Sequence, residues 1–576
     1  MTVARAATVY DRYRGAKAKA PEQALAWNVY GTGLENVGRE GRPELVPVGR
    51  PGPDQLLIRI DAVGLCFSDI KLIRLGGDHP KLYGRDLRTQ PTRLGHEASV
   101  TVMDVGSDLA GRFRPGQRLA IQPDIYVAGR SAAYGYTTPG GLIEYHLLGP
   151  EVLAADDGAY VVPVDDRLGY AETALTEPWA CVEAAYTQRR RLWPLAGGRL
   201  LVVGRPGDTR RYEFGEALAG VAEVVLVDVD EPNAASIRAA APSATVATAA
   251  AFDPAGGYDD VILLDPRSAA LVGRAADALA FRGVLNLVGQ APLDGPVDID
   301  IGRLHYHYIA YVGTAGTRVD AAYGEARNRA ELRRGGVTVV VGAAGPMGQM
   351  HVERALTLPD GPRLVVAVDL DAERLAAARE KLAPVAARTG RELVVEQLGQ
   401  EPDALAVLVR QYAAAGADDV VVTAPSARAV VAASEAMASD GMLVLFAGVP
   451  VGTRASLDLS SVYLHGAQLT GTSGSRIADQ ALVVDKTVAG QLEPRRALAA
   501  VGGIEAARDA LQALMDGRFP GKIVIFPALR DLPLTSLPDL ARAEPDVGRA
   551  LDAGGAWTAE AEAALFDRHL RPADRQ

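Results

Sequence analysis

The sequence predicts a mainly-β domain followed by two tandem α/β domains, each built on a doubly wound parallel sheet. Between about residues 24 and 165, short segments alternate apolar and polar residues with a period of two and are separated by glycine and proline. From about residue 170, short β-branched runs alternate with alanine-rich helical segments, which is the pattern of βαβ units. This second pattern occurs twice along the chain. We therefore expect a duplicated α/β domain.

The composition limits the classes of protein that fit. A chain of 576 residues exceeds what one hydrophobic core supports, so several domains are expected. A formal charge of -11 argues against nucleic acid as the main partner. No apolar run is long enough for a signal peptide or a membrane span, and two cysteines cannot form a disulfide framework. We expect a cytoplasmic protein that acts on a small molecule and binds neither nucleic acid nor a membrane.

The β-domain is expected to contain five main strands. Each carries β-branched or alternating apolar residues and ends at a turn signal. The expected strands lie within "DQLLIRIDAVGL", "EASVTVMDVGSDL", "GQRLAIQ", "GGLIEYHLL" and "AYVVPV". Their short connections predict mainly antiparallel pairing.

Two anchors support an internal duplication of the α/β domain. When "YDDVILLDP" is set above "ADDVVVTAP", Pro266 falls on Pro425, an offset of 159 (425 − 266). When "YVGTAGT" is set above "LTGTSGS", Gly313 falls on Gly471, an offset of 158 (471 − 313). This spacing is far longer than a solenoid repeat. We therefore expect two copies of one whole domain.

The second copy carries a complete dinucleotide-binding pattern. In "VTVVVGAAGPMG", glycines at three positions separate a strand from a helix, where a pyrophosphate can approach the backbone at the helix amino terminus. Asp369 lies 21 residues after Gly348 (369 − 348) and suits a ribose 2'-hydroxyl, which favours NAD over NADP. The expected cofactor-binding residues are Gly342, Gly345, Pro346, Met347, Gly348, Asp369 and Arg374.

The first copy has a weaker form of this pattern. "LLVVGRPGDTRRYEF" keeps Gly204 and Gly207 but has Asp208 near the place of the third glycine, and its helix looks shortened. Asp208 would repel a pyrophosphate, whereas Arg205, Arg210 and Arg211 would attract one. Asp228 keeps the acidic position at the end of the next strand. We expect a degenerate scaffold or an oligomer surface in preference to a second NAD site.

Cys66, His96, Glu97 and Glu177 form a candidate metal-binding set. Cys66 follows a predicted strand, His96 and Glu97 stand between a glycine and a strand, and Glu177 lies at the start of a predicted helix. Zinc accepts thiolate, imidazole and carboxylate ligands together in open catalytic sites. Each residue also has a simpler role: Cys66 in packing, Glu97 as an acceptor that orients the imidazole, Glu177 at a helix amino terminus.

Four motifs give the chain a recognisable resemblance. "GLCFSDI", "GHEASVTVMDVGSDLAGRFRPGQRLAI", "GGLIEYHLL" and "EPWACVEAAY" occur in this order before a dinucleotide fold. Over about residues 45 to 527 the chain resembles the zinc-dependent medium-chain alcohol and polyol dehydrogenases, in the branch of sorbitol dehydrogenase, threonine dehydrogenase and sorbose-phosphate reductase. The resemblance implies a GroES-like catalytic domain joined to Rossmann-like domains.

The resemblance also implies roles for particular residues. A catalytic zinc would be held by Cys66, His96 and Glu97, with Glu177 as a fourth ligand or in exchange with water. Ser68 would hydrogen-bond the substrate oxygen and relay its proton, and Asp69 would orient the ligands from behind. The implied reaction is hydride transfer between NAD and a secondary alcohol, most plausibly a polyol, sugar or sugar phosphate.

The chain departs from this family pattern in three ways. The segment that often holds a four-cysteine structural zinc reads "QPDIYVAGRSAAYGYTTPGGLIEY" and has no cysteine, so we expect one zinc per chain and no structural zinc. Lys71 stands where many relatives have a relay histidine, and it is either a catalytic residue, a contact for a substrate phosphate or a solvated surface lysine. The duplication is not the ordinary family plan.

These interpretations leave alternatives open. The same scaffold suits an amino-alcohol dehydrogenase, a redox-neutral epimerase or lyase with tightly bound NAD, or a non-catalytic binding protein. A homo-oligomer, dimer or tetramer, is expected. The expected domains are a GroES-like zinc catalytic domain, a first Rossmann-like domain, a second NAD-binding domain, a return segment completing the catalytic domain and an extension of unassigned function, at residues 1–190, 191–330, 331–475, 476–530 and 531–576.

Two further features have weaker interpretations. Cys181 lies one helical turn after Glu177, and a small buried role is expected for it. His305 and His307 in "LHYHYIAY" have the alternate spacing that places both on one face of a strand.

Overall fold

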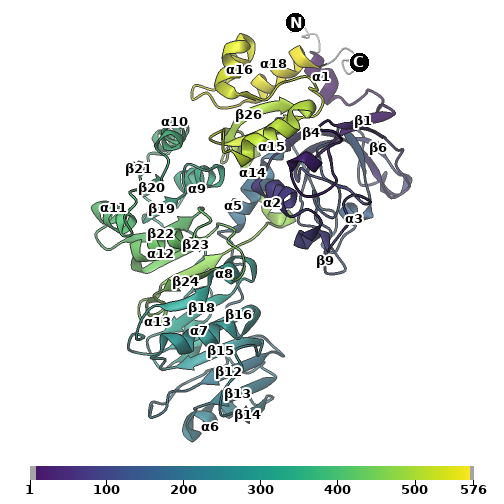
Figure 1. Cartoon of the computed structure of the whole chain (residues 1–576). Coiled ribbons are helices and arrows are strands. Elements are labelled where there is room, and N and C mark those ends of the chain that lie inside the picture. The colour runs from purple at the N-terminus through teal and green to yellow at the C-terminus, as the bar shows by residue number, and fades with distance from the viewer. Residues whose placement is uncertain (1–7, 571–576) are drawn as a thin grey trace. The chain divides into compact units, whose positions relative to one another are not determined.

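The computed structural model describes residues 8–570 and consists of two compact units. The first unit combines Met1–Glu183 with Gly474–Gln576, and the second is Ala184–Ser473. A mainly-β part is thus followed by two parallel-sheet domains, which confirms the predicted fold class (Figure 1). None of the helices in the described part of the chain is both long enough and apolar enough to span a bilayer.

The first unit is built around one eight-stranded sheet that joins two distant parts of the chain. The strand order is β11-β7-β6-β4-β27-β26-β28, and β10 also pairs with β4. Strands β26 and β27 come from the return segment, and β27 runs antiparallel to β4. The bounds are β4 Leu56–Gly64, β6 Glu97–Val105, β7 Arg118–Ile121, β10 Tyr145–Leu148, β11 Val161–Pro163, β26 Leu498–Gly503, β27 Lys522–Phe526 and β28 Thr535–Ser536.

Strand β4 lies at the centre of this sheet. Every residue of β4 is buried, because the sheet continues on both edges and apolar side chains cover both faces. The chain then turns directly into helix α2 (Phe67–Leu75), so the loop between them opens at the end of the sheet. Helix α5 (Thr176–Ala184) supplies the remaining predicted ligand, Glu177.

The end of the chain is partly helical. Residues after the last strand form α16 (Leu537–Ala543), α17 (Pro545–Ala550) and α18 (Ala559–His569). Helix α18 lies against the amino-terminal helix α1 (Val9–Arg14) within the same unit (Figure 1). The side chain of Glu562 is buried there and accepts hydrogen bonds from the backbone of helix α4 (Tyr170–Ala174).

The two copies in the second unit have the same sheet topology. The first sheet has the order β14-β13-β12-β15-β16-β18 and the second β21-β20-β19-β22-β23-β25, and all neighbouring strands are parallel. This is the doubly wound order. The bounds are β12 Arg199–Val203, β13 Glu223–Val227, β14 Thr245–Thr248, β15 Tyr258–Leu264, β16 Leu279–Val288, β18 Ala310–Thr314, β19 Val337–Val341, β20 Leu364–Asp369, β21 Glu392–Gln397, β22 Ala417–Val422, β23 Met437–Leu445 and β25 Gln468–Gly471.

The helices of the two copies differ. The second copy has a helix after its first strand, α9, whereas residues 204–222 of the first copy contain no helix. The helix expected to be shortened is therefore missing altogether. The bounds are α6 Glu231–Ala240, α7 Ala269–Asp277 and α8 Ile301–Tyr306 in the first copy, and α9 Pro346–Thr357, α10 Ala372–Thr389, α11 Ala404–Tyr412, α12 Ala427–Ala436 and α13 Ser460–Leu464 in the second.

The prediction of a strand around His305 is wrong. His305 lies in helix α8, and His307 is the residue that ends this helix. The strand begins only at Ala310. The alternate spacing of the two histidines therefore does not place them on one strand face.

The two copies pack against each other about a local two-fold axis. Strand β17 (Val297–Asp300) of the first copy pairs antiparallel with its counterpart β24 (Arg454–Leu457). Asp298 pairs with Ser456, 158 residues further on (456 − 298), and the pairs Val297–Leu457 and Ile299–Ala455 flank it symmetrically. Both copies contribute buried residues to one continuous apolar core. The contact thus has the form of an isologous dimer interface within one chain.

Candidate active site

Asp69 ties together the two loops that carry the predicted metal ligands. Strand β4 ends at Gly64, helix α2 begins at Phe67, and Cys66 caps the helix between them. The buried carboxylate of Asp69 accepts the backbone N–H of Cys66 through Oδ2 at 2.9 Å and that of Gly95 through Oδ1 at 3.1 Å. The loop before His96 is therefore held against the loop of Cys66.

Cys66, His96 and Glu97 converge at this point. One ligand atom from each, the sulfur, a ring nitrogen and a carboxylate oxygen, lies within 4.8 Å of the other two. Glu97 opens strand β6 and pairs with Gly64 of β4. A Cβ atom at Gly64 would lie 2.1 Å from Oε2 of Glu97, so glycine is needed there for the carboxylate to fit. The sequence spacing of these residues gives no sign of this contact, which the pairing of β4 with β6 creates.

The charge of Glu97 is balanced by Lys522, a residue that the sequence did not single out. The buried ammonium of Lys522, at the start of β27, donates to Oε1 of Glu97. Burial acts to lower the pKa of Lys522, but the charge of Glu97 outweighs it, so the pKa is raised and the ammonium stays charged. The only sequence signal was a lysine opening the otherwise apolar run "KIVIF".

The donor set fits a zinc ion. Oε2 of Glu97 is buried and makes no hydrogen bond with a described residue, although burying an unpaired carboxylate oxygen is costly. Nδ1 of His96 lies 3.5 Å from Oδ1 of Asp69, which leaves the other ring nitrogen for a ligand bond. One sulfur, one nitrogen and one oxygen donor are a combination that zinc accepts. Asp69 stands where a carboxylate orients a metal-binding histidine.

Glu177 stays outside the three-residue cluster. Its side chain is buried in α5, close enough for the charges of His96 and Glu97 to act on it. Burial raises the pKa of Glu177 to about 7, and the charge of Glu97 adds to the effect while that of His96 opposes it. The thiol of Cys181 contacts Oε1 of Glu177 at 3.8 Å, and burial raises the pKa of this thiol. The role of Glu177 as a fourth ligand stays a prediction.

The structure separates the two predicted proton-handling residues. Oγ of Ser68 lies 3.7 Å from the sulfur of Cys66 and is within reach of the cluster. Lys71, three residues further along α2, is exposed and has no hydrogen bond or ion pair with a described residue. The structure therefore brings Ser68 to the cluster and leaves Lys71 at the surface.

The predicted NAD-binding residues lie in the turn after strand β19, at the end of β20 and in helices α9 and α10. Gly342 has a φ of +85°, and a Cβ atom at Gly348 would lie 2.2 Å from the carbonyl oxygen of Gly342. Both positions therefore need glycine. Helix α9 begins at Pro346, and Oδ2 of Asp369 accepts the N–H of Ala344 in the same turn at 3.0 Å. Met347 lies in the first turn of α9 and Arg374 in the first turn of α10.

Comparisons with known proteins agree with this geometry. The model of the family described as "Alcohol dehydrogenase GroES-like domain" matches residues 52–161. A putative D-xylulose reductase of Agrobacterium fabrum is 31% identical over 272 residues, which cover 44% of this chain and 73% of that protein. This chain belongs to the zinc-type medium-chain dehydrogenase/reductase family. It is an alcohol or polyol dehydrogenase by class.

Two other comparisons extend over most of the dehydrogenase. Mannitol-1-phosphate 5-dehydrogenase of Aliivibrio fischeri is 24% identical over 528 residues, covering 89% of this chain and 92% of that protein. The solved structure of 2R,3R-butanediol dehydrogenase from Bacillus subtilis has a TM-score of 0.52 at 14% identity and covers 88% of this chain and 99% of that one. The comparison with butanediol dehydrogenase shows a shared fold.

Tyr136 is a neighbour of the cluster, and two residues that the sequence did not single out, His79 and Lys81, lie beside it. The ring of His96 lies 5.9 Å from that of Tyr136, and the ring of His79 lies 5.0 Å from it. Lys81 lies 4.9 Å from the same ring and pairs with Asp124 at 2.9 Å. Burial and the charges of Lys81 and Lys71 lower the pKa of His79 to about 4, so this imidazole is neutral at physiological pH.

Proposed function

We propose that this chain is a zinc-dependent, NAD-linked dehydrogenase that interconverts a secondary alcohol and a ketone on a polyol, sugar or sugar phosphate. The observation that carries the proposal is the convergence of Cys66, His96 and Glu97, together with the buried Oε2 of Glu97, which has no hydrogen-bond partner among the described residues. The names of relatives support the substrate class: besides the two above, an L-sorbose 1-phosphate reductase of Klebsiella pneumoniae is 28% identical over 295 residues.

The cofactors would supply the electrophile and the hydride acceptor. A zinc ion held by Cys66, His96 and Glu97 would polarise the alcohol oxygen, and NAD bound by the second copy would take the hydride. The carboxylate of Asp369 at the glycine turn favours NAD, because it would repel the 2'-phosphate of NADP. Glu177 is proposed as the group that completes the zinc coordination or gives way to substrate.

The residues around the cluster would position the substrate and move its proton. Ser68 is the hydroxyl beside Cys66 and would accept the proton that leaves the substrate alcohol. Burial raises the pKa of Tyr136, so this phenol stays neutral, and its hydrogen bond with Ser68 would hold the Ser68 hydroxyl in place. Asp69 would hold the imidazole of His96, and Lys522 would hold Glu97.

The test combines metal analysis with a substrate panel. Protein purified without chelator is expected to contain one zinc per chain and to form NADH from NAD with at least one polyol or sugar phosphate. Zinc near zero would contradict the metal assignment. Product formation without net NADH would contradict the dehydrogenase reaction and indicate a redox-neutral enzyme with tightly bound NAD.

A further inference from the structure

The first copy of the α/β domain contains a cavity that the proposed dehydrogenase reaction does not use. A cavity of about 250 Å³ lies at the carboxyl ends of β12, β13 and β15. In open parallel sheets this crevice is the usual place for a ligand. Its wall includes Gly204, Arg205, Asp228, Phe252, Arg267 and Arg274.

The first copy has lost the means of binding a pyrophosphate at a helix. Val203 and Val341 end the corresponding strands, so Gly204 and Gly207 match Gly342 and Gly345. No helix follows in the first copy, and the ring of N–H groups that a helix amino terminus offers to phosphate is absent from residues 204–222. A complete dinucleotide therefore has no support of the kind present in the second copy.

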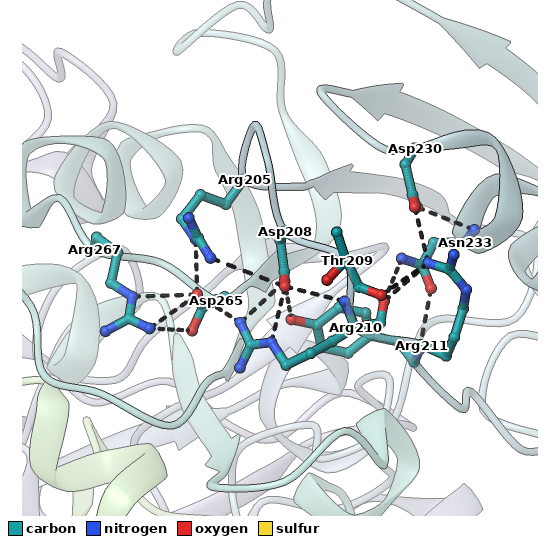
Figure 2. Close-up of polar contacts among 10 residues, drawn as sticks. Arg205, Asp208, Thr209, Arg210, Arg211, Asp230, Asn233, Asp265 and Arg267 are labelled. Carbon is teal, nitrogen blue, oxygen red and sulfur yellow. Dashed lines mark hydrogen bonds and ion pairs between the residues drawn. The ribbon is translucent and has the colours of Figure 1, made fainter.

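Arginine side chains take the place of that helix (Figure 2). The buried carboxylate of Asp265 accepts hydrogen bonds from Nε of Arg205 at 2.7 Å and from Nη2 of Arg267 at 3.0 Å, and it forms an ion pair with Arg210. Burial would raise the pKa of Asp265, but hydrogen bonds from Arg210, Arg267 and Arg205 outweigh it and lower the pKa. At the offset of 159, Asp265 corresponds to Ala424, so this anchor belongs to the first copy alone.

Two of these arginines keep donors for a ligand. The side chains of Arg205 and Arg267 are 38% and 43% exposed and line the cavity, whereas Asp265 is fully buried beneath them. Nη1 of each arginine makes no hydrogen bond with a described residue. With Arg274 in the wall, three arginines face two carboxylates, Asp228 and Asp265, and the excess of one positive charge favours an anion.

Asp228 adds a second carboxylate to the lining of the cavity. In the second copy the equivalent Asp369 accepts the N–H of Ala344. The first copy has Pro206 at that place in the turn, and proline has no N–H to donate. Asp228 is exposed and has no hydrogen bond or ion pair with a described residue. A carboxylate at the end of this strand is placed to accept hydrogen bonds from ribose hydroxyls.

An apolar wall completes the cavity. Phe252 is buried, and the guanidinium of Arg274 lies 5.0 Å from the centre of its ring. Leu271 and the exposed Ala251 stand beside it. A planar base can lie against such a wall, because aromatic and guanidinium groups both stack on flat rings.

We propose that the first copy is a separate binding site for a ribonucleoside monophosphate. The phosphate contacts Arg205 and Arg267, the ribose hydroxyls contact Asp228, and the base lies against Phe252. The cavity volume of about 250 Å³ is below the roughly 300–1,000 Å³ of pockets that enclose drug-sized ligands, which argues against a complete dinucleotide. This site is independent of the dehydrogenase reaction and of the NAD site in the second copy.

The test measures binding of AMP to the full chain by calorimetry, with and without saturating NAD. One AMP per chain is expected in both conditions. Asp228→Gly, which keeps the backbone φ of +53°, and Ala251→Trp, which fills the cavity, are each expected to weaken AMP binding at least tenfold. Glu231→Ala on the exposed face of α6 is the control and leaves AMP binding unchanged. Adenosine and 2'-deoxy-AMP are expected to bind at least tenfold more weakly than AMP.

Three outcomes would overturn the proposal. They are no AMP binding at millimolar concentration, displacement of AMP by NAD in a ratio of one to one, and AMP binding that neither Asp228→Gly nor Ala251→Trp weakens. Two NAD per chain, one of them lost in Asp228→Gly, would overturn the assignment to a mononucleotide. None of these readouts depends on catalysis, so failure here is distinguishable from failure of the dehydrogenase proposal.

Discussion

At the scale of single residues, the proposed metal-binding cluster depends on two charged side chains that are not proposed as ligands. Asp69 holds the loops of Cys66 and His96 together, and Lys522 neutralises Glu97 from the other end of the sequence. The first contact is local, whereas the second exists only because β27 pairs with β4. The cluster is therefore completed by the return segment of the chain.

Cys66 is the proposed sulfur ligand, so replacing it tests whether zinc binding depends on this residue. Cys66→Ser is expected to lower zinc content to near zero and to lower kcat by at least a hundredfold, because the polarising ion is lost. Zinc is measured by mass spectrometry and activity by NADH formation. Cys181→Ser, the same change at the only other cysteine, is expected to keep its zinc. A metal-free Cys66→Ser protein with full activity would refute the assignment.

Lys522 is the partner of a buried carboxylate, so its loss leaves an unpaired charge. Lys522→Met in metal-free protein is expected to lower the free energy of unfolding by about 3–5 kcal/mol. The double variant Glu97→Gln with Lys522→Met is expected to recover much of this loss. Urea denaturation measures both. The control Lys71→Met, at an exposed lysine, should change stability by less than about 0.5 kcal/mol. Equal stability of Lys522→Met and the native chain would contradict the ion pair.

The sequence predicted the candidate ligands but not the side chains that hold them. Cys66, His96 and Glu97 were detectable because chemically unusual residues stand beside glycines at strand ends, and because the family motifs repeat this arrangement. Lys522 and the pair Lys81–Asp124 carried no such signal. A single charged residue has no local pattern, and its partner is decided by strand pairing between distant segments.

At the scale of elements, helix α18 completes the start of helix α4 (Tyr170–Ala174). The buried carboxylate of Glu562 accepts the N–H groups of Tyr170 at 2.6 Å and Ala171 at 2.9 Å, and the hydroxyl of Tyr10 at 2.6 Å. The first N–H groups of a helix have no partner within it, and a carboxylate is favoured at that end. The carboxyl-terminal extension thus caps helix α4, which belongs to the first third of the sequence.

Removing this cap is expected to destabilise the first unit. Glu562→Ala leaves two buried N–H groups without an acceptor, which should lower the free energy of unfolding by about 3 kcal/mol. Glu560→Ala, on the exposed side of the same helix, serves as the control and should have almost no effect. Thermal denaturation compares the two. Equal effects of the two substitutions would show that α18 does not cap α4.

Glu172 in α4 makes the stability of the same region depend on pH. Burial raises its pKa to about 7, and the charges of Glu562 and Glu493 add to this while Arg495 opposes it. Since the unfolded pKa is about 4.5, the folded chain binds a proton more tightly between these values. The contribution is complete below about pH 4.5 and is lost as pH rises to about 7, by up to about 3 kcal/mol.

Glu172→Gln should remove this dependence. The variant is expected to be more stable than the native chain above pH 7 and to lose less stability between pH 5 and pH 7.5, because its side chain carries no charge at either value. Urea denaturation at several pH values measures the slope. If the free energy of unfolding of the variant changed with pH as steeply as that of the native chain, another group would be responsible for the pH dependence.

Element types were more predictable than their lengths. The parallel strands were detectable because continuous β-branched runs alternate with alanine-rich segments. The complete loss of the helix after β12 and the helix at His305 were not, because both segments mix polar and aromatic residues without a clear helix or strand period.

At the scale of the whole molecule, the duplication places two homologous domains in the arrangement of a symmetric dimer. The register of β17 with β24 is symmetric about Asp298 and Ser456, and apolar residues of both copies share one core. The first copy therefore covers an apolar face of the second copy. The first copy thus has a structural role, even though no helix follows its glycine turn.

A shared core predicts that the two copies lose stability together. Ile299 is fully buried, pairs with Ala455 of the other copy and belongs to this core. Ile299→Ala leaves a cavity between the copies and should lower the opening free energy of both sheets by about 2–4 kcal/mol. Hydrogen exchange of the amides in β12 and β19 measures the two sheets separately.

The control is Val451→Ala, at a residue that precedes β24 and is half exposed, and it should change neither sheet by more than about 0.5 kcal/mol. If Ile299→Ala weakened protection in β12 and left β19 unchanged, the second copy would not depend on the first for its stability. Faster exchange in both strands, to a similar extent, is expected because the β17–β24 pair and the residues behind it belong equally to the two copies.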